Sequence, residues 1–151
     1  MLIVFLIISN FLFSQSIKVE TRRGWIETIP VSDILEAGND YVGTYISANN
    51  QTEITINPRK KNNTTIVFIR KEYVFGDWHP NLDLQIRRTD TGNGDSSGGT
   101  SFQTITDNNA VFFLTNGQQR KVPIQYRING ISVLLPVQDY TATIIYTVYD
   151  Y

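Results

Sequence analysis

The chain has 151 residues, enough for one domain that buries a core without a metal or a disulfide. Its 13 Lys and Arg residues against 14 Asp and Glu residues leave a formal net charge of -1, so the overall charge gives no reason to expect nucleic acid as a partner. Apolar residues make up 41% of the chain, with 8 Tyr and 8 Phe, which is the composition of a globular protein, and the many Thr, Val and Ile residues favour strands over helices.

Residues 1–14 are interpreted as a signal peptide. Residues 1–13 are almost continuously apolar but too short to span a membrane comfortably, and the small residue Ser14 precedes a plausible cleavage point. A short membrane anchor is the alternative, while the absence of Cys leaves no residue to carry a lipid. The Phe-Ser-Gln ending is similar to bacterial export signals. We therefore expect a secreted, periplasmic or cell-surface protein whose only membrane element is this export signal.

Residues 15–151 are expected to form a single all-β domain. Apolar and polar residues alternate from Ile17 to Val31, which predicts one long strand or two short ones with a bend at Gly24. Residues 32–35 could form one helical turn, the only helical feature of the pattern. Further strands are predicted at residues 41–46, 52–56, 65–71 and 82–86. The run 65–71 is apolar on both faces, which predicts a central strand.

The second half of the chain continues this pattern after a polar interruption. Residues 90–99 contain no apolar side chain, which predicts an exposed, mobile loop. Asn129-Gly130 between apolar residues predicts a tight hairpin. Strands are predicted at residues 102–106, 110–114, 122–128, 132–135 and 140–149. Eight or nine short strands separated by turn signals predict an immunoglobulin-like antiparallel β-sandwich.

No group of residues in the sequence suggests catalysis. A nucleophile with its base would need a histidine, and the only one is His79, in a Trp-His-Pro turn; no Cys is present. No pair of acids is fixed at a spacing suited to glycoside hydrolysis. The acidic loop 90–99 departs from the spacing of an EF-hand, because Gly92 and Gly94 stand where ligands would be needed. We predict no enzyme, no catalytic residue, no cofactor and no metal site.

Two other features could bind ligands. Trp25, Trp78 and Tyr73 are candidates for an aromatic platform that binds carbohydrate, although aromatic residues in sandwiches usually pack in the core. The basic clusters at residues 59–61 and 87–88 could contact phosphate, acidic sugar or lipopolysaccharide, or could simply be solvated turns.

The most distinctive stretches are residues 120–128, RKVPIQYRI, and 135–148, LPVQDYTATIIYTV. They resemble the closing strands of spore-coat-U-like proteins and of chaperone-usher pilin subunits. The resemblance is confined to this part of the chain. The sequence departs from the family pattern because it has no Cys for a disulfide and because Asp139 stands where a Gly commonly precedes the tyrosine of the last strand.

The resemblance implies an incomplete sandwich whose groove is filled by the N-terminal strand of a neighbouring subunit. The donor residues would be Ile17, Val19 and Thr21. The acceptor edge would contain Tyr140, Ala142, Ile144 and Tyr146. The N-terminal strand could equally pair within its own domain and close the sandwich, an arrangement that we favour and that the residues alone leave open.

These patterns lead to one functional hypothesis and one alternative. We expect an exported structural or adhesive protein of a bacterial cell envelope, in its most specific form a pilin-like fibre subunit that assembles by strand addition. Its partner would be another protein or a further copy of itself. The alternative is a secreted carbohydrate-binding module, with a glycan as the partner.

Overall fold

The computed structural model describes residues 16–21, 25–30 and 41–151. The predicted signal peptide at residues 1–14 and the predicted helical turn at residues 32–35 lie outside the described residues. The described residues form nine strands and no helix, and every pair of hydrogen-bonded strands is antiparallel. This confirms the predicted all-β antiparallel fold; the immunoglobulin-like topology stays a prediction. In this part of the chain, no helix is long and apolar enough to cross a membrane.

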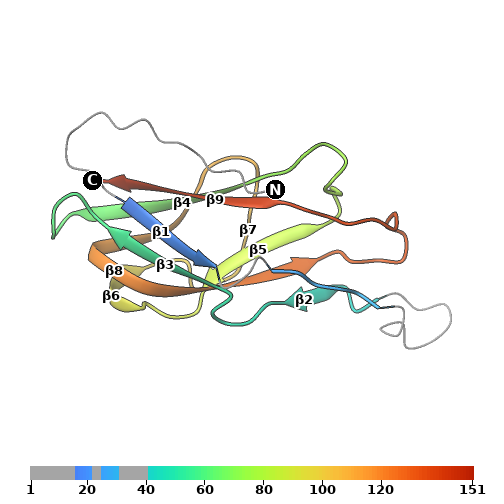
Figure 1. Ribbon diagram of the computed structural model, residues 1–151, viewed down its shortest axis with the longest axis horizontal. Helices are drawn as coiled ribbons and strands as arrows, with labels where there is room; N and C mark the ends of the chain where they lie inside the picture. Colours follow the sequence, from blue (N-terminus) through green and yellow to red (C-terminus); the bar gives the residue numbers. More distant parts are fainter. Residues whose placement is uncertain (1–15, 22–24, 31–40) are drawn as a thin grey trace.

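The nine strands are numbered in chain order. They are β1 (Ser16–Thr21), β2 (Thr44–Ile46), β3 (Thr52–Asn57), β4 (Thr64–Glu72), β5 (Asp83–Arg88), β6 (Asn93–Ser97), β7 (Gln103–Thr104), β8 (Ala110–Asn129) and β9 (Thr143–Asp150). Figure 1 shows them as two layers, with β9 and β4 in one and β3, β5 and the second half of β8 in the other.

The long strand β8 belongs to both layers. Its first half pairs with β4 and β6, and its second half pairs with β2, β3 and β5. The strand bends near Gly117, which has a φ of 72° that glycine adopts without strain. The sequence predicted two strands separated by a turn at Asn116-Gly117. This prediction was wrong, because the glycine bends one continuous strand instead of ending it.

The core lies between the two layers and is lined by alternating residues of the long strands. In β3, β4 and β5 every second side chain is buried, as the pleat of a strand requires. The core cluster contains Ile54, Ile56, Val67, Ile69, Leu84, Ile86, Ile105, Phe112, Phe113, Val122, Ile124 and Tyr126. The period-two alternation read from the sequence therefore identified the inner face of these strands.

The polar segment at residues 90–99 contains a strand, which corrects the predicted mobile loop. Within it, β6 pairs with β8, and Ser96 is buried. The Gln119 side chain donates a hydrogen bond to the Asp95 carbonyl, at 2.6 Å, and the Arg88 side chain donates one to the Ser96 carbonyl, at 3.0 Å. This strand is held by backbone pairing and by polar side chains, so its sequence has no apolar alternation that would predict a strand.

The predicted hairpin at Asn129-Gly130 is also wrong. Gly130 does have the positive φ of such a turn, 84°, but it packs against the Asn81 carbonyl. The next residues do not return as a strand. Residues 132–135, predicted as a strand, form a turn in which Leu134 is 89% exposed. The chain reaches β9 only at Thr143.

Candidate functional site

The strands β1 and β9 lie at the two ends of the strand order β1-β3-β8-β4-β9. All six residues of β1 pair with β3, and all eight residues of β9 pair with β4. Among the described residues, neither strand has a second ladder. The two strands approach one another at one end of the molecule (Figure 1). Both sequence-predicted partners of strand addition are thus outer strands.

The N-terminal strand β1 pairs within its own chain, in register from Ser16 opposite Asn57 to Thr21 opposite Thr52. Ile17 packs against the core, whereas Val19 is 39% exposed. On the other face, Lys18 and Glu20 form an exposed ion pair at 2.7 Å, and the hydrogen bond from Lys18 lowers the pKa of Glu20. The donation of β1 to a neighbouring molecule stays a prediction.

The strand β9 presents part of its main chain at the sheet edge. The Tyr151 amide donates to the Thr64 carbonyl at 2.8 Å, which fixes the alternation of the ladder between β4 and β9. By that alternation, the main-chain groups of Ile144 and Tyr146 face away from β4. Their side chains are partly buried and pack against the core. An added strand would therefore pair with an edge whose own side chains are held by the core.

Two of the predicted acceptor residues lie outside β9. Ala142 precedes the strand by one residue and packs against the core. Tyr140 lies in the irregular segment before it, where its hydroxyl donates to the Pro136 carbonyl at 2.7 Å and its ring meets His79 edge-on. The prediction that the edge begins at Tyr140 was wrong, because this side chain stabilises a loop.

Tyr146 attaches β9 to the opposite layer through a chain of buried hydroxyl groups. Its hydroxyl lies 2.8 Å from the Tyr126 hydroxyl, which donates to the Thr52 hydroxyl at 2.8 Å. Burial raises the pKa of Tyr126, and it raises the pKa of Tyr146 further. Trp25 stacks on the Tyr126 ring with centroids 6.3 Å apart. These hydrogen-bonded hydroxyl groups connect β9, β8 and β3.

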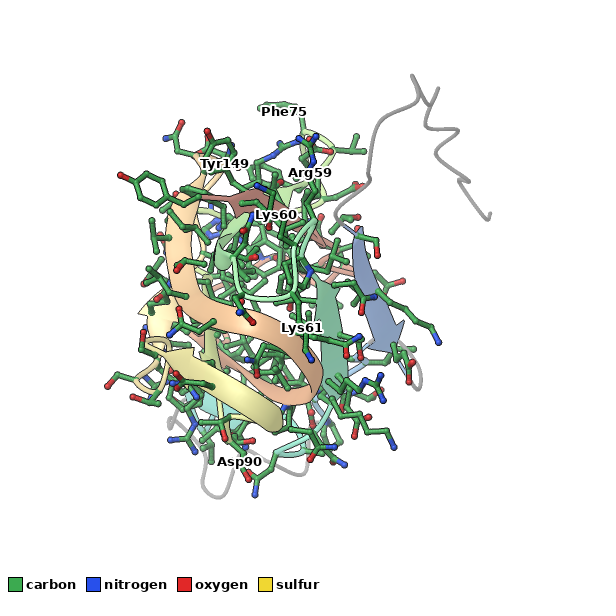
Figure 2. The ribbon with its side chains drawn as sticks, turned by 90° about the vertical axis from the view of Figure 1, so that its left-hand side faces the viewer. Arg59, Lys60, Lys61, Phe75, Asp90 and Tyr149 are labelled. Carbon is green, nitrogen blue, oxygen red and sulfur yellow. The ribbon has the colours of Figure 1, made fainter. Side chains whose placement is uncertain are left out.

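The outer face of the layer containing β9 carries an apolar surface, here called the outer patch. It consists of Ile66, Phe68, Val111, Leu114, Ile145 and Tyr149. Ile66 lies opposite both Leu114 and Tyr149, so these side chains form a row across three strands. Tyr149 is 58% exposed, and Figure 2 shows its ring pointing away from the molecule.

The sequence contained a signal for this patch that we interpreted differently. Both faces of residues 65–71 are apolar, which predicted a central strand. The strand β4 is central, between β8 and β9, but its outward side chains Ile66 and Phe68 are only partly buried. A contiguous apolar patch on the uncovered face of a sheet indicates a surface that another molecule can cover.

The three residues of the predicted aromatic platform do not gather in one place. Trp25 stacks on Tyr126, and its indole N–H donates to Glu27 at 3.1 Å. Trp78 and Tyr73 do come together, because the ammonium group of Lys71 lies 5.0 Å from the Trp78 ring and 5.8 Å from the Tyr73 ring. The platform is therefore reduced to this pair.

A hollow of about 330 Å³ lies beside Lys71 and Tyr73, and its other lining residues are Arg70, Glu72 and Asp107. Burial lowers the pKa of Lys71, an effect opposed by the negative charges of Asp83 and Asp107. The hollow combines both signs of charge with one exposed ring, which is a surface suited to a polar ligand such as a sugar.

Other residues singled out in the sequence have structural contacts. His79 accepts a hydrogen bond from the Asn81 amide at 3.2 Å within its turn. Within the described ranges, no group of three or more His, Asp or Glu side chains is placed to hold a metal ion. The basic residues 59–61 lie at the same end of the molecule as Tyr149, and the Arg59 amide donates to Asp150 at 2.6 Å (Figure 2).

The chain matched no protein-family model, no curated protein and no solved structure. The resemblance of residues 120–148 to pilin subunits therefore stays a prediction. The function has to be argued from the exposed edges and surfaces of the sandwich.

Proposed function

We propose that the protein is an exported cell-envelope component that binds a protein partner, or further copies of itself, by strand addition at β9. The observation that carries this proposal is the composition of β9. From Thr143 to Tyr149 the strand consists of Thr, Ile, Tyr and Val alone, with neither Lys nor Pro. Outer strands of monomeric proteins are usually protected by such residues, because a bare edge pairs with other chains.

The other outer strand provides an internal comparison. The exposed face of β1 carries Lys18 and Glu20, the kind of charged side chains that discourage edge pairing. The two edges of one molecule thus differ: the edge of β1 is protected, and that of β9 is not. This difference favours β9 as the acceptor.

An added strand would gain two kinds of contact at β9. Its main chain would bond to the outward-facing groups of Ile144 and Tyr146, and its outward side chains would extend the outer patch beside Ile145 and Tyr149. The buried contact of Tyr146 with Tyr126 holds the acceptor in place beforehand, so little ordering of β9 is needed on binding.

The donor in a fibre would be the N-terminal strand of the next molecule. Of the predicted donor residues Ile17, Val19 and Thr21, Ile17 packs against its own core and Val19 is 39% exposed. A strand with so small an anchor can leave β3 at low cost and pair with β9 of a neighbour. The pilin-like fibre is the most specific form of this proposal.

The test introduces charge at the edge. We expect the purified protein to form oligomers that grow with concentration, and the double variant Thr147→Lys, Tyr149→Lys to remain monomeric in sedimentation experiments. The matched control is Thr104→Lys in the short strand β7, which should associate as the wild type does. Hydrogen exchange adds a specific readout, because strand addition should protect the amides of Ile144 and Tyr146.

Two results would contradict the proposal. One, which contradicts the form in which the protein pairs with copies of itself, is a wild-type protein that stays monomeric at every concentration. The other is association that leaves the exchange of the Ile144 and Tyr146 amides unchanged, since contact through the outer patch alone would not protect them.

The alternative is a carbohydrate-binding module, favoured by the hollow beside Lys71 and Tyr73 and by the Trp78 ring on the Lys71 ammonium group. In that case glycan binding should be lost in Trp78→Ala and in the more exposed variant Tyr73→Ala, and should survive Thr147→Lys. Under strand addition the dependence is reversed: association survives Tyr73→Ala and is lost with the edge variants. A glycan array and sedimentation of the same variants separate the two functions.

A further inference from the structure

On the outer face of the other layer, two arginines share one aromatic ring. Arg87 of β5 and Arg127 of β8 place their guanidinium carbons 4.6 Å and 4.1 Å from the centroid of the Phe102 ring. In the ladder between these strands, Arg87 lies opposite Gln125 and Gln85 lies opposite Arg127. The two arginines are therefore diagonal neighbours on one sheet face.

Neutral groups hold both arginines in position. The Nε of Arg87 donates to Gln125 Oε1 at 2.8 Å, and the Nε of Arg127 donates to Gln85 Oε1 at 2.8 Å. The nearby carboxylate of Asp83 accepts a hydrogen bond from Gln85 Nε2 at 2.5 Å. Across the described ranges, neither arginine takes part in an ion pair. Two positive charges thus lie side by side without a carboxylate bound to either.

A hollow of about 250 Å³ adjoins Arg87. It is lined by Asn49, Arg87, Arg88, Thr89 and Thr100, all of which can donate hydrogen bonds and none of which is acidic.

Arg88 is fixed at the inner side of this hollow. Its guanidinium group donates to the carbonyls of Gly98, Ser96 and Asp90, the last two at 3.0 Å and 3.3 Å. Burial lowers the pKa of Arg88, and the negative charge of Asp90 opposes this effect. The Asp90 carboxylate accepts a hydrogen bond from the Thr91 amide at 2.6 Å. The terminal amino groups of Arg87 have no protein acceptor in the described part of the chain, so they are available to a ligand.

We propose that this hollow and the neighbouring Arg127 bind an acidic polysaccharide. A carboxylate or sulfate group of one sugar would lie in the hollow on Arg87, and a second anionic group of the same chain would reach Arg127. Guanidinium groups bind such oxyanions with paired hydrogen bonds, and stacking on Phe102 fixes the two donors before the ligand arrives. The two arginines held on one ring present two donor groups, and a chain with repeating anionic groups can occupy both.

This site is separate from β9, so it adds a ligand to the proposed assembly function. It also differs from the hollow beside Lys71 and Tyr73, because recognition here rests on charge and not on an exposed aromatic ring. The net charge of -1 would not attract a polyanion, so binding depends on the local pair of arginines.

The test is a calorimetric titration of the full protein with polygalacturonate, dextran sulfate, neutral dextran and inorganic phosphate. We expect at least one charged polymer to bind. The double variant Arg87→Gln, Arg127→Gln should bind that polymer at least about tenfold more weakly, because it loses the charge-assisted hydrogen bonds. The variant Arg87→Lys, Arg127→Lys keeps the charges but lacks the planar fork, and should bind with intermediate strength.

The matched control is Lys60→Gln, Lys61→Gln, which removes the same charge from a different surface. In Figure 2, Lys60 and Lys61 lie over the middle of the molecule, and Asp90, which follows Arg88 closely in the chain, lies at its lower edge. Control binding within twofold of the wild type supports the site, provided that thermal unfolding shows all variants to be folded.

Three outcomes would overturn the proposal. These are the absence of polymer binding by the wild type, an equal loss of binding in the lysine control, and phosphate binding as tight as that of the polymer. The last would mean that the site takes a small oxyanion instead of a polysaccharide.

Discussion

The hydroxyl of Tyr146 is the atom that most directly links the candidate edge to the interior. It lies 2.8 Å from the Tyr126 hydroxyl, in a place where burial raises the pKa of both phenols. A raised pKa means that the folded protein keeps these protons at pH values where the unfolded chain, with a phenol pKa of about 10, has lost them. The free energy of unfolding therefore has its full value below pH 10. It falls as the pH rises through and above the pKa of the unfolded phenols, because ionisation then favours the unfolded chain.

We predict that Tyr146→Phe lowers the free energy of unfolding by about 1 kcal/mol at neutral pH, the usual net value of one hydrogen bond. Above pH 10 the stability of the wild type should fall steeply, and that of the variant should fall less, because one of the two buried phenols is gone. Urea unfolding between pH 7 and pH 11 measures both effects. Parallel pH profiles for the two proteins would contradict this account of Tyr146.

Single residues also show how far the sequence alone could lead. Ile144 and Tyr146 were placed at an acceptor edge by the resemblance to pilin subunits, and they lie in β9. Tyr140 shares their parity, but a loop contact with Pro136 takes its side chain, and no alternation rule contains that contact. The three-residue stack of Arg87, Phe102 and Arg127 joins distant parts of the chain, so only a fold could reveal it.

The strands themselves differ in how clearly their sequences identify them. Strands β3, β4 and β5 bury alternate apolar side chains, and their predicted ranges agree closely with the observed ones. Strand β6 contains Asn, Gly, Asp and Ser, and it is held by its backbone and by polar side chains from β8 and Arg88. Composition cannot find such a strand, because its stabilising partners lie outside it.

At the level of β1, we predict that deleting residues 15–23 has a small effect on stability and a large one on assembly. The strand packs one apolar side chain, Ile17, against the core, so its loss should lower the free energy of unfolding by only about 2 kcal/mol. Under strand donation, the concentration-dependent oligomers should disappear, because no donor remains. Denaturant unfolding and sedimentation of the deletion variant test this. Oligomers that persist would show that β1 is not the donor.

At the scale of the whole molecule, the two proposed interactions should differ in their response to salt. Strand addition relies on main-chain hydrogen bonds and apolar contacts, which salt screens little, whereas the arginine site relies on charge. We predict that raising sodium chloride from 0.05 M to 0.5 M leaves the oligomers in place and weakens polysaccharide binding by about tenfold or more. Sedimentation and calorimetry at the two salt concentrations provide the comparison. Oligomers that dissociate into monomers at the higher salt concentration would instead indicate association through charged surfaces.

The position of β8 late in the chain limits which strands can pair while the polypeptide is still incomplete. Five other strands pair with it, and the ladders that do not involve it are β1 with β3, β4 with β9 and β5 with β7. A nascent polypeptide that ends before Ala110 can form only the first and last of these, so its isoleucines and valines have no opposite layer to pack on. The native state therefore cannot form until both β8 and β9 are present, and before that the incomplete polypeptide has a strong tendency to aggregate.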